Sequence, residues 1–167
     1  MRQVMKSTKR TKKTLPTGTK GKIGRKKSAW SALSSLSSVS VLSSRAAAPV
    51  GAYPHARRVG NLIFLSGIGP REPGTDLIPK GIEAEIHSTF RNVKAVLEEA
   101  GATWDAIVDI QVFLTDMRRD FPVFNRIYAE YFKNNQPTRT TIEVGALPTP
   151  IHIEIKIIAA VGKAEKF

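Results

Sequence analysis

Two polar residues on neighbouring strand-like segments, Arg139 and Glu154, are the side chains best suited to chemistry in this sequence. Residues 137–144 and 151–157 both alternate β-branched or apolar residues with polar ones, which is the period of a half-buried strand. A guanidinium can bind a carboxylate through two parallel hydrogen bonds, and a carboxylate in a shielded cleft can exchange protons with water. The same pattern is typical of a solvent-facing sheet surface crossed by ion pairs, and the pattern alone favours that second interpretation.

The elements that must position these residues can be predicted from hydrophobic periodicity and capping signals. Short apolar segments at residues 56–59, 61–65 and 107–114 are typical of strands. Residues 82–100 have the spacing of an amphipathic helix, and a second helix is predicted with Asp120 as its N-cap. Together with the two segments above, the order β, β, α, β, α, β, β predicts an α+β fold with both helices on one face of a single sheet. The other face needs cover, which an oligomer interface would supply.

Several short stretches occur together in a specific order and spacing. They are Gly51-Ala52-Tyr53, Asn61 to Gly67, Val112 to Met117, Phe124-Asn125 with Tyr128 to Phe132, Pro137-Thr138-Arg139-Thr140 and Ile153-Glu154-Ile155. Through them the sequence from about Gly51 to Val161 resembles the RidA/YjgF superfamily of imine and enamine deaminases. The resemblance implies a chorismate-mutase-like fold with a single mixed sheet. It also implies a homotrimer around a central barrel, with sites at the subunit interfaces.

The resemblance assigns roles to individual residues. It implies that Arg139 grips the carboxylate of a small-molecule substrate and that Glu154 positions or activates the attacking water. Gly67, followed by Ile68, matches the place where the family lets backbone N–H groups reach the substrate. The implied reaction is hydrolytic deamination of 2-imino or 2-amino-enoic acids to 2-keto acids and ammonia, without a metal or another cofactor.

Three further positions are expected near the substrate. Tyr53 matches a family tyrosine that lines the pocket, Asn125 matches a recurrent family position, and Thr141 stands where family members often have Cys. A hydroxyl at Thr141 can still hydrogen-bond, so this departure does not remove the site. The alternatives are a packed surface aromatic for Tyr53 and a locally hydrogen-bonded side chain for Asn125.

The substrate and the function class are left open at this level. The run Tyr53-Pro54-His55, Arg71 and residues 137–141 resemble the 2-aminomuconate deaminase branch, whose substrate carries two carboxylates. Arg71 or His55 could meet the second carboxylate, and solvation of both side chains in their loops is an equal alternative. Two other classes of function are alternatives to the deaminase. One is a non-catalytic carboxylate-binding module, and the other is an RNA-interacting protein, because some superfamily members carry translation-inhibitor or ribonuclease labels.

Composition divides the chain near residue 50. Residues 1–50 contain twelve Lys or Arg and no Asp or Glu, so the formal net charge of +12 lies there. We expect residues 1–49 to be a basic, Ser-rich extension, either disordered or a transit peptide, and residues 50–167 to be the RidA-like domain. The spacing of apolar residues within 28–44 permits a marginal helix. Residues 1–48 are therefore expected to be dispensable, and the location to be cytoplasmic, or mitochondrial if the extension is a transit peptide.

Absences in the sequence exclude several classes of function. Without Cys there can be no disulfide, no thiolate catalysis and no Cys-ligated zinc. The three histidines, His55, His87 and His152, fall in different predicted elements and lack the spacing of metal ligands. No run of about 18 apolar residues is present, so no membrane span is predicted. The basic extension would attract nucleic-acid phosphates non-specifically, because no recognition motif accompanies its charge.

Overall fold

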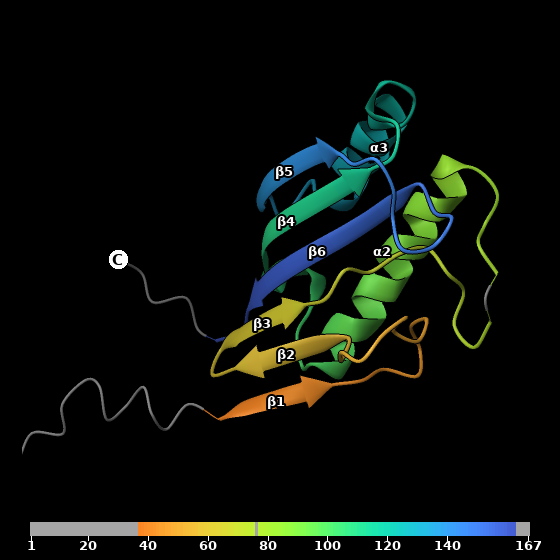
Figure 1. Cartoon of the computed structure of the whole chain (residues 1–167). Coiled ribbons are helices and arrows are strands. Elements are labelled where there is room, and N and C mark those ends of the chain that lie inside the picture. Colours follow the sequence, from red (N-terminus) through yellow and green to blue (C-terminus); the bar gives the residue numbers. More distant parts are fainter. Residues whose placement is uncertain (1–36, 76, 163–167) are drawn as a thin grey trace, which may run out of the picture. The chain divides into compact units, whose positions relative to one another are not determined.

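The computed structural model describes residues 37–75 and 77–162, which form six strands and two α-helices (Figure 1). The strands are β1 (Ser38–Val41), β2 (Ala56–Val59), β3 (Leu62–Leu65), β4 (Ile107–Leu114), β5 (Thr138–Glu143) and β6 (Ile153–Ala160). The helices are α2 (Ile82–Glu99) and α3 (Met117–Tyr131), and a 3₁₀ turn at Trp104–Ala106 precedes β4. Every predicted strand and helix is present, and β1 is an additional strand.

The sheet is mixed, as expected. Its strand order is β1-β2-β3-β6-β4-β5, with β4 and β5 parallel and the other neighbouring strands antiparallel. Helix α3 is the crossover from β4 to β5, because two parallel strands cannot be joined by a tight turn. Strand β4 therefore lies between β5 and β6, the two strands that carry Arg139 and Glu154.

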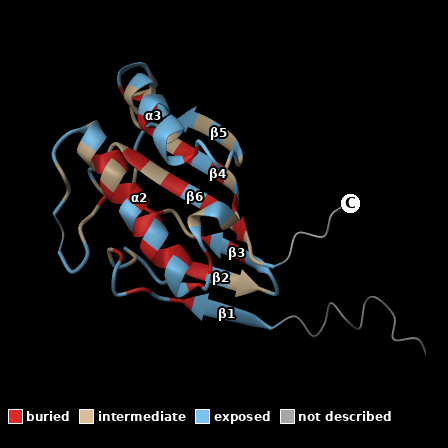
Figure 2. Cartoon of the chain, turned by 180° about the vertical axis from the view of Figure 1, so that it is seen from behind, coloured by how far each residue is buried: buried red, intermediate tan, exposed pale blue. Residues whose placement is uncertain are grey.

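Both helices cover the same face of the sheet, and the core fills the space between the two layers (Figures 1 and 2). Helix α2 buries the residues that the predicted helical spacing placed together: Ile86, Phe90, Val93 and Leu97. The sheet contributes every second residue of two strands to the same core: Ile110, Val112 and Leu114 on β4, and Ile153, Ile155 and Ile157 on β6. Neither of the two described helices is long and apolar enough to cross a membrane.

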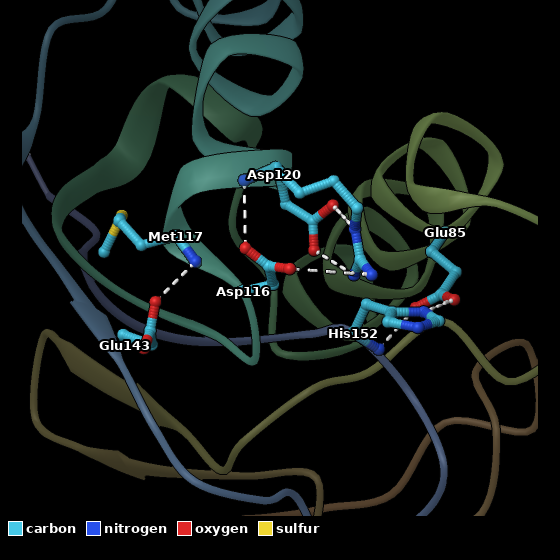
Figure 3. A network of polar contacts seen from close by, with 7 residues as sticks. Glu85, Asp116, Met117, Asp120, Glu143 and His152 are labelled. Carbon is cyan, nitrogen blue, oxygen red and sulfur yellow. Dashed lines mark hydrogen bonds and ion pairs between the residues drawn. The ribbon is translucent and has the colours of Figure 1, made fainter.

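Helix α3 begins earlier than predicted. Asp116 is its N-cap and accepts the amide of Arg119 at 2.9 Å. Asp120, the expected cap, is buried inside the first turn and receives two hydrogen bonds of 2.7 Å from the Arg119 guanidinium. Glu143 on β5 accepts the amide of Met117 at 2.7 Å, so β5 also caps this helix (Figure 3). Two aspartates four residues apart give the same capping signal, and only tertiary contacts decide between them.

The expected boundary at residue 49 is wrong for residues 38–49, which belong to the folded domain. Strand β1 pairs with β2, with Val41 opposite Ala56, and both Val41 and Ala46 are buried in the core. The segment in which a helix was permitted is thus a strand over β1, and its part before residue 37 lies outside the described residues. The Ser-Val-Ser-Val run has the period of a strand, and β2 supplies the partner that makes this conformation favourable.

The sheet face opposite the helices carries exposed apolar side chains. Leu62, Phe64 and Ile142 are 38%, 37% and 44% exposed. The strand register places these three residues on the same side as Glu154, because directly paired residues point to the same face of a sheet. This is the face for which the sequence predicted an oligomeric cover, and the oligomer itself stays a prediction.

Candidate functional site

One hollow beside β6 gathers five of the predicted site residues. Tyr53, Gly67, Ile68, Arg71 and Glu154 all line it. The lining is completed by a wall of residues 47–50 and by residues of the loop that precedes β6, Pro148, Thr149 and Ile151. We call this hollow the Glu154 pocket. It combines one carboxylate and one guanidinium with a largely apolar surround.

The glycine at position 67 leaves room for the Glu154 carboxylate, which a side chain at this position would displace. A Cβ atom added to Gly67 would lie 2.6 Å from the Glu154 carboxyl carbon and would overlap the carboxylate oxygen as well. From the resemblance, the glycine at this position was expected to let backbone amides approach a substrate. The structure adds a second reason, since the Gly67 backbone forms the surface against which the carboxylate packs. The two positions are therefore coupled in space although 87 residues separate them in the chain.

Glu154 has the electrostatics of a proton-transfer group. Burial raises the pKa of its carboxyl group above the ordinary value. Within the described residues the carboxylate has no hydrogen bond and no ion pair, so the surface ion pair that the strand pattern also allowed is not found at Glu154. His152 instead contacts Glu85 of α2, with 2.6 Å between its Nδ1 and the carboxylate and 2.7 Å from its backbone amide (Figure 3). The Glu154 carboxylate is thus available to a ligand or a water.

The loop after β3 is fastened on both sides of Gly67. Ile68 and Ile155 exchange two backbone hydrogen bonds of 2.9 Å, so the Ile68 amide is occupied by β6. Ser66 donates its amide to the His55 carbonyl at 2.9 Å and its hydroxyl to the Pro54 carbonyl at 2.7 Å. Among the described residues, the Gly67 amide has no partner. Of the two amides expected to reach a substrate, the structure leaves that of Gly67 for the role.

His55 does not have the solvated position that was considered for it, and Arg71 is only partly exposed. His55 is 4% exposed, accepts the Ser43 amide through Nδ1 at 3.0 Å, and donates from Nε2 to the Ala47 carbonyl at 2.8 Å. Arg71 donates from its guanidinium to the Ala48 carbonyl. Both side chains therefore hold the wall at residues 47–50. The expectation that His55 meets a second substrate carboxylate is wrong, because both of its ring nitrogens are used within the protein.

Sequence analysis missed Asn92 on α2, which is buried and lines the same pocket. Its side-chain amide donates to the carbonyl oxygens of Gly69 and Arg71, at 2.9 and 2.8 Å. It therefore fixes the loop that carries Arg71 against the helix layer. The helical spacing marked Asn92 only as a neighbour of the apolar stripe, so no sequence signal distinguished it from an exposed polar residue.

Arg139 lies in a second hollow, the Arg139 groove, between α3 and the start of β5. Its guanidinium carbon sits 4.5 Å from the centre of the Tyr128 ring, 5.7 Å from Phe124 and 5.8 Å from Phe121. Asn125 lines the same groove. Burial raises the pKa of the Tyr128 phenol, and the positive charge of Arg139 opposes that shift. Three aromatic rings thus restrict the orientation of the guanidinium and leave its N–H groups to form hydrogen bonds at its edge.

A single chain does not bring Arg139 and Glu154 together. In the sheet register Arg139 is paired with the buried Ile110, so its side chain points to the helix-covered face. Glu154 is paired with Phe113, which in turn is paired with Ile142, and this row points to the open face. Polar and apolar residues alternate along β5 and β6 as predicted. The polar residue Arg139 and the polar residue Glu154 nevertheless lie on opposite faces of the sheet, and β4 lies between their strands.

Thr141 is on the Arg139 side of the sheet. Its hydroxyl oxygen is buried and has no hydrogen-bond partner among the described residues. A buried hydroxyl without a partner costs free energy unless a water or ligand satisfies it. Over the same residues, no group of three or more His, Asp or Glu could hold a metal ion.

Comparisons with known proteins agree with this architecture. A family model described as Endoribonuclease L-PSP matches residues 43–161. A RutC family protein of Pyrococcus abyssi is 40% identical over 120 residues, which are 71% of this chain and 94% of that protein. Protein MMF1, mitochondrial, of Saccharomyces cerevisiae is 34% identical over 119 residues, which are 71% of this chain and 81% of that protein.

Among solved structures, E. coli TdcF with bound serine matches with a TM-score of 0.71 at 31% identity, covering 74% of this chain and 99% of that one. The family match begins at residue 43, inside the segment that sequence analysis had placed outside the domain. The mixed six-stranded sheet with two helices is the fold of these relatives, as the resemblance implied. The chain belongs to the RidA/YjgF family, whose family model is described as Endoribonuclease L-PSP.

Proposed function

We propose that this protein is a metal-free deaminase that hydrolyses 2-imino or 2-amino-enoic acids to 2-keto acids and ammonia. The observation that carries the proposal is the Glu154 carboxylate, half-buried and packed on Gly67, without a polar partner in the described part of the chain. A desolvated carboxylate of this kind is suited to take and return a proton near neutral pH. The solved E. coli TdcF has serine bound, which supports an amino-acid-like ligand with a carboxylate.

The reaction needs two groups with different tasks. The Arg139 guanidinium binds the substrate carboxylate through two parallel hydrogen bonds, and its stacking on Tyr128 fixes the plane of that fork. Glu154 removes a proton from a water while the oxygen adds to the C2 carbon of the protonated imine. The resulting carbinolamine takes a proton from Glu154 at nitrogen, and the C–N bond breaks with loss of ammonia. Glu154, ionised again, takes the hydroxyl proton as the keto group forms and passes it to the departing ammonia, which leaves as ammonium. No net oxidation or reduction occurs.

We further propose that the complete site forms between copies of the chain in a homotrimer. Two features support this. Arg139 and Glu154 point to opposite sheet faces within one chain, and the face that bears Glu154 also bears the exposed Leu62, Phe64 and Ile142. Burial of such a patch against identical copies would stabilise the assembly. One copy then contributes the Glu154 pocket, and its neighbour contributes Arg139 with Asn125 and Thr141.

The substrate class that we favour is the general one of small 2-imino acids. A dedicated 2-aminomuconate deaminase would need a second cation for the second carboxylate, and Arg71 is the candidate in the Glu154 pocket. The Arg71 guanidinium already donates to the Ala48 carbonyl, which supports a role in holding the wall. Rates on 2-aminomuconate and on the imine from leucine test this choice. Arg71→Ala should affect both substrates alike, and a loss confined to 2-aminomuconate would favour the dedicated enzyme.

A second candidate function is action on RNA, which the description of the family model favours. The two functions are separated by assaying one preparation in two ways. Imines are generated in situ from leucine by an amino-acid oxidase, and ammonia release is followed with and without the protein. Binding of 2-keto acids is measured in parallel by calorimetry. Faster ammonia release is expected. Binding of keto acids without any acceleration would favour a binding module, and cleavage of single-stranded RNA without deamination would favour the ribonuclease.

The compartment is also a proposal. A relative in yeast bears the name mitochondrial, and residues 1–36 are basic and free of acidic residues. We propose that these residues direct the protein to mitochondria. Fluorescent fusions of the full chain and of a chain lacking residues 1–36 should differ in location, and identical cytoplasmic patterns would contradict the proposal.

A further inference from the structure

The wall of the Glu154 pocket is a short irregular segment held by few groups. Residues 47–50 line the pocket, and residues 42–46 connect them to the end of β1. The Arg45–Glu98 ion pair at 2.7 Å is exposed to solvent, so it adds little to the stability of this segment. Arg45 also donates to the Ala95 carbonyl at 3.5 Å, and within the described residues the side chains from elsewhere in the chain that bond to the backbone around the wall are Arg71 and His55. Of these two, His55 alone is fully enclosed.

His55 makes two hydrogen bonds of opposite polarity to one segment. Its Nδ1 accepts the Ser43 amide at 3.0 Å, and its Nε2 lies 2.8 Å from the Ala47 carbonyl, to which it must donate. These two bonds define a neutral imidazole with its proton on Nε2. The backbone carbonyl of the same residue accepts the Ser66 amide at 2.9 Å, next to Gly67. One residue therefore ties the wall to the loop on which the Glu154 carboxylate packs.

We infer that His55 is a positioning residue that sets the wall of the Glu154 pocket for substrate binding. Neither ring nitrogen is available to a substrate, because Nδ1 accepts from Ser43 and Nε2 donates to Ala47. Its loss should therefore change how well the pocket receives a substrate more than how fast the bound substrate reacts. The kinetic part of this inference rests on the proposed deaminase function, and the structural part does not.

We call the two hydrogen bonds of the His55 ring to Ser43 and Ala47 the His55 clamp. Three substitutions separate these two bonds. His55→Asn keeps an acceptor near the Nδ1 position, His55→Gln keeps a donor near the Nε2 position, and His55→Leu removes both. We expect KM to rise about tenfold in His55→Leu and about threefold in the two amide variants, with kcat within about twofold of wild type. His87→Asn is the matched control and should change neither constant, because His87 is half-buried on α2, contacts the Tyr131 hydroxyl at 3.0 Å and does not line the Glu154 pocket.

An activity-independent measurement tests the clamp itself. Hydrogen exchange at fixed pH should be faster in the peptide that covers residues 42–50 for His55→Leu than for wild type, and unchanged for His87→Asn. Unchanged exchange in that peptide, or a fall in kcat with constant KM, would overturn the positioning role. If His55→Leu does not fold, the amide variants carry the same comparison. Absence of turnover in the wild type would refute the deaminase proposal and leave the exchange result as the test of the clamp.

Discussion

In the Glu154 pocket the carboxylate is half-buried and has no polar partner among the described residues, whereas in the Arg139 groove the guanidinium carbon lies 4.5 to 5.8 Å from the centres of three aromatic rings. A carboxylate that transfers protons benefits from desolvation, because desolvation brings its pKa toward neutral pH. An arginine that binds a carboxylate benefits from a fixed plane and from free N–H edges. The two regions therefore look like the two halves of one site, each prepared for a different task.

The most severe way to disturb one region alone is to remove its wall. Deleting residues 1–48 takes away β1, the buried Val41 and Ala46, and part of the Glu154 pocket, but leaves the Arg139 groove. We expect loss of activity and a decrease of about 3 kcal/mol or more in the free energy of unfolding. Deleting residues 1–36 is the control and should leave both unchanged. Equal stability and activity of the two truncated chains would show that the wall is dispensable.

Glu154→Gln should abolish proton transfer and leave the pocket shape intact. We expect kcat to fall by about 10²–10⁴-fold with little change in keto-acid binding, measured by ammonia release and by calorimetry. In the wild type, activity should increase as the pH rises through the pKa of Glu154, because the base must be ionised. If binding and turnover fall together, Glu154 supports the pocket and does not act on water.

The same variant has a stability signature. Burial raises the pKa of Glu154 in the folded state, so the contribution of this group to stability is complete at low pH and is lost as the pH rises through the folded-state pKa. Glu154→Gln should therefore melt at a higher temperature than wild type at neutral pH, and the difference should vanish in acid. The opposite sign at neutral pH would mean that the carboxylate has a stabilising partner.

Gly67→Ala tests the contact that makes the first region unusual. The added methyl group overlaps the Glu154 carboxylate, so the carboxylate must move, and a displacement of about 1 Å can cost about 10² in rate. Gly145→Ala is the matched control, because a Cβ at Gly145 meets no atom within 4 Å. Steady-state rates of the two variants measure the effect. Similar rates for both would show that the Gly67–Glu154 contact does not matter for turnover.

Arg139→Lys tests the second region. The charge is kept but the planar fork is lost, so we expect a loss of about 2–3 kcal/mol in transition-state stabilisation, or roughly 30–150-fold in kcat/KM. Arg126→Lys, on the exposed side of α3 where the arginine pairs with Glu83, is the control. Near-wild-type kinetics in Arg139→Lys would assign Arg139 to the packing of α3.

Much of the fold could be predicted from the sequence. The helical spacing of Ile86, Phe90, Val93 and Leu97, the apolar character of β4 and the alternation in β6 are local patterns, and they appear as buried stripes in the structure. Gly67 and Glu154 were each expected near the substrate from the resemblance, and both line one pocket.

Other features could not be predicted, because they depend on partners far away in the chain. Alternation shows which residues of one strand share a face, but it does not show which face meets the helices. The position of Arg139 and Glu154 on opposite faces of the sheet could therefore not be predicted. Serine-rich composition concealed β1, which is stable only because β2 pairs with it. His55 had the signature of a loop residue, and its burial depends on bonds to Ser43 and Ala47.

The central claim is that the Glu154 pocket and the Arg139 groove form one site across two copies of the chain. Arg139→Lys and Glu154→Gln chains carrying different affinity tags can be produced together, and only trimers that contain both are retained by two successive purifications. In every such mixed trimer, one interface of the three pairs an intact Glu154 with an intact Arg139. The account predicts that ammonia release recovers to about a third of the wild-type rate, although each variant alone is nearly inactive. Mixed assemblies that remain as inactive as the two separate variants would contradict it.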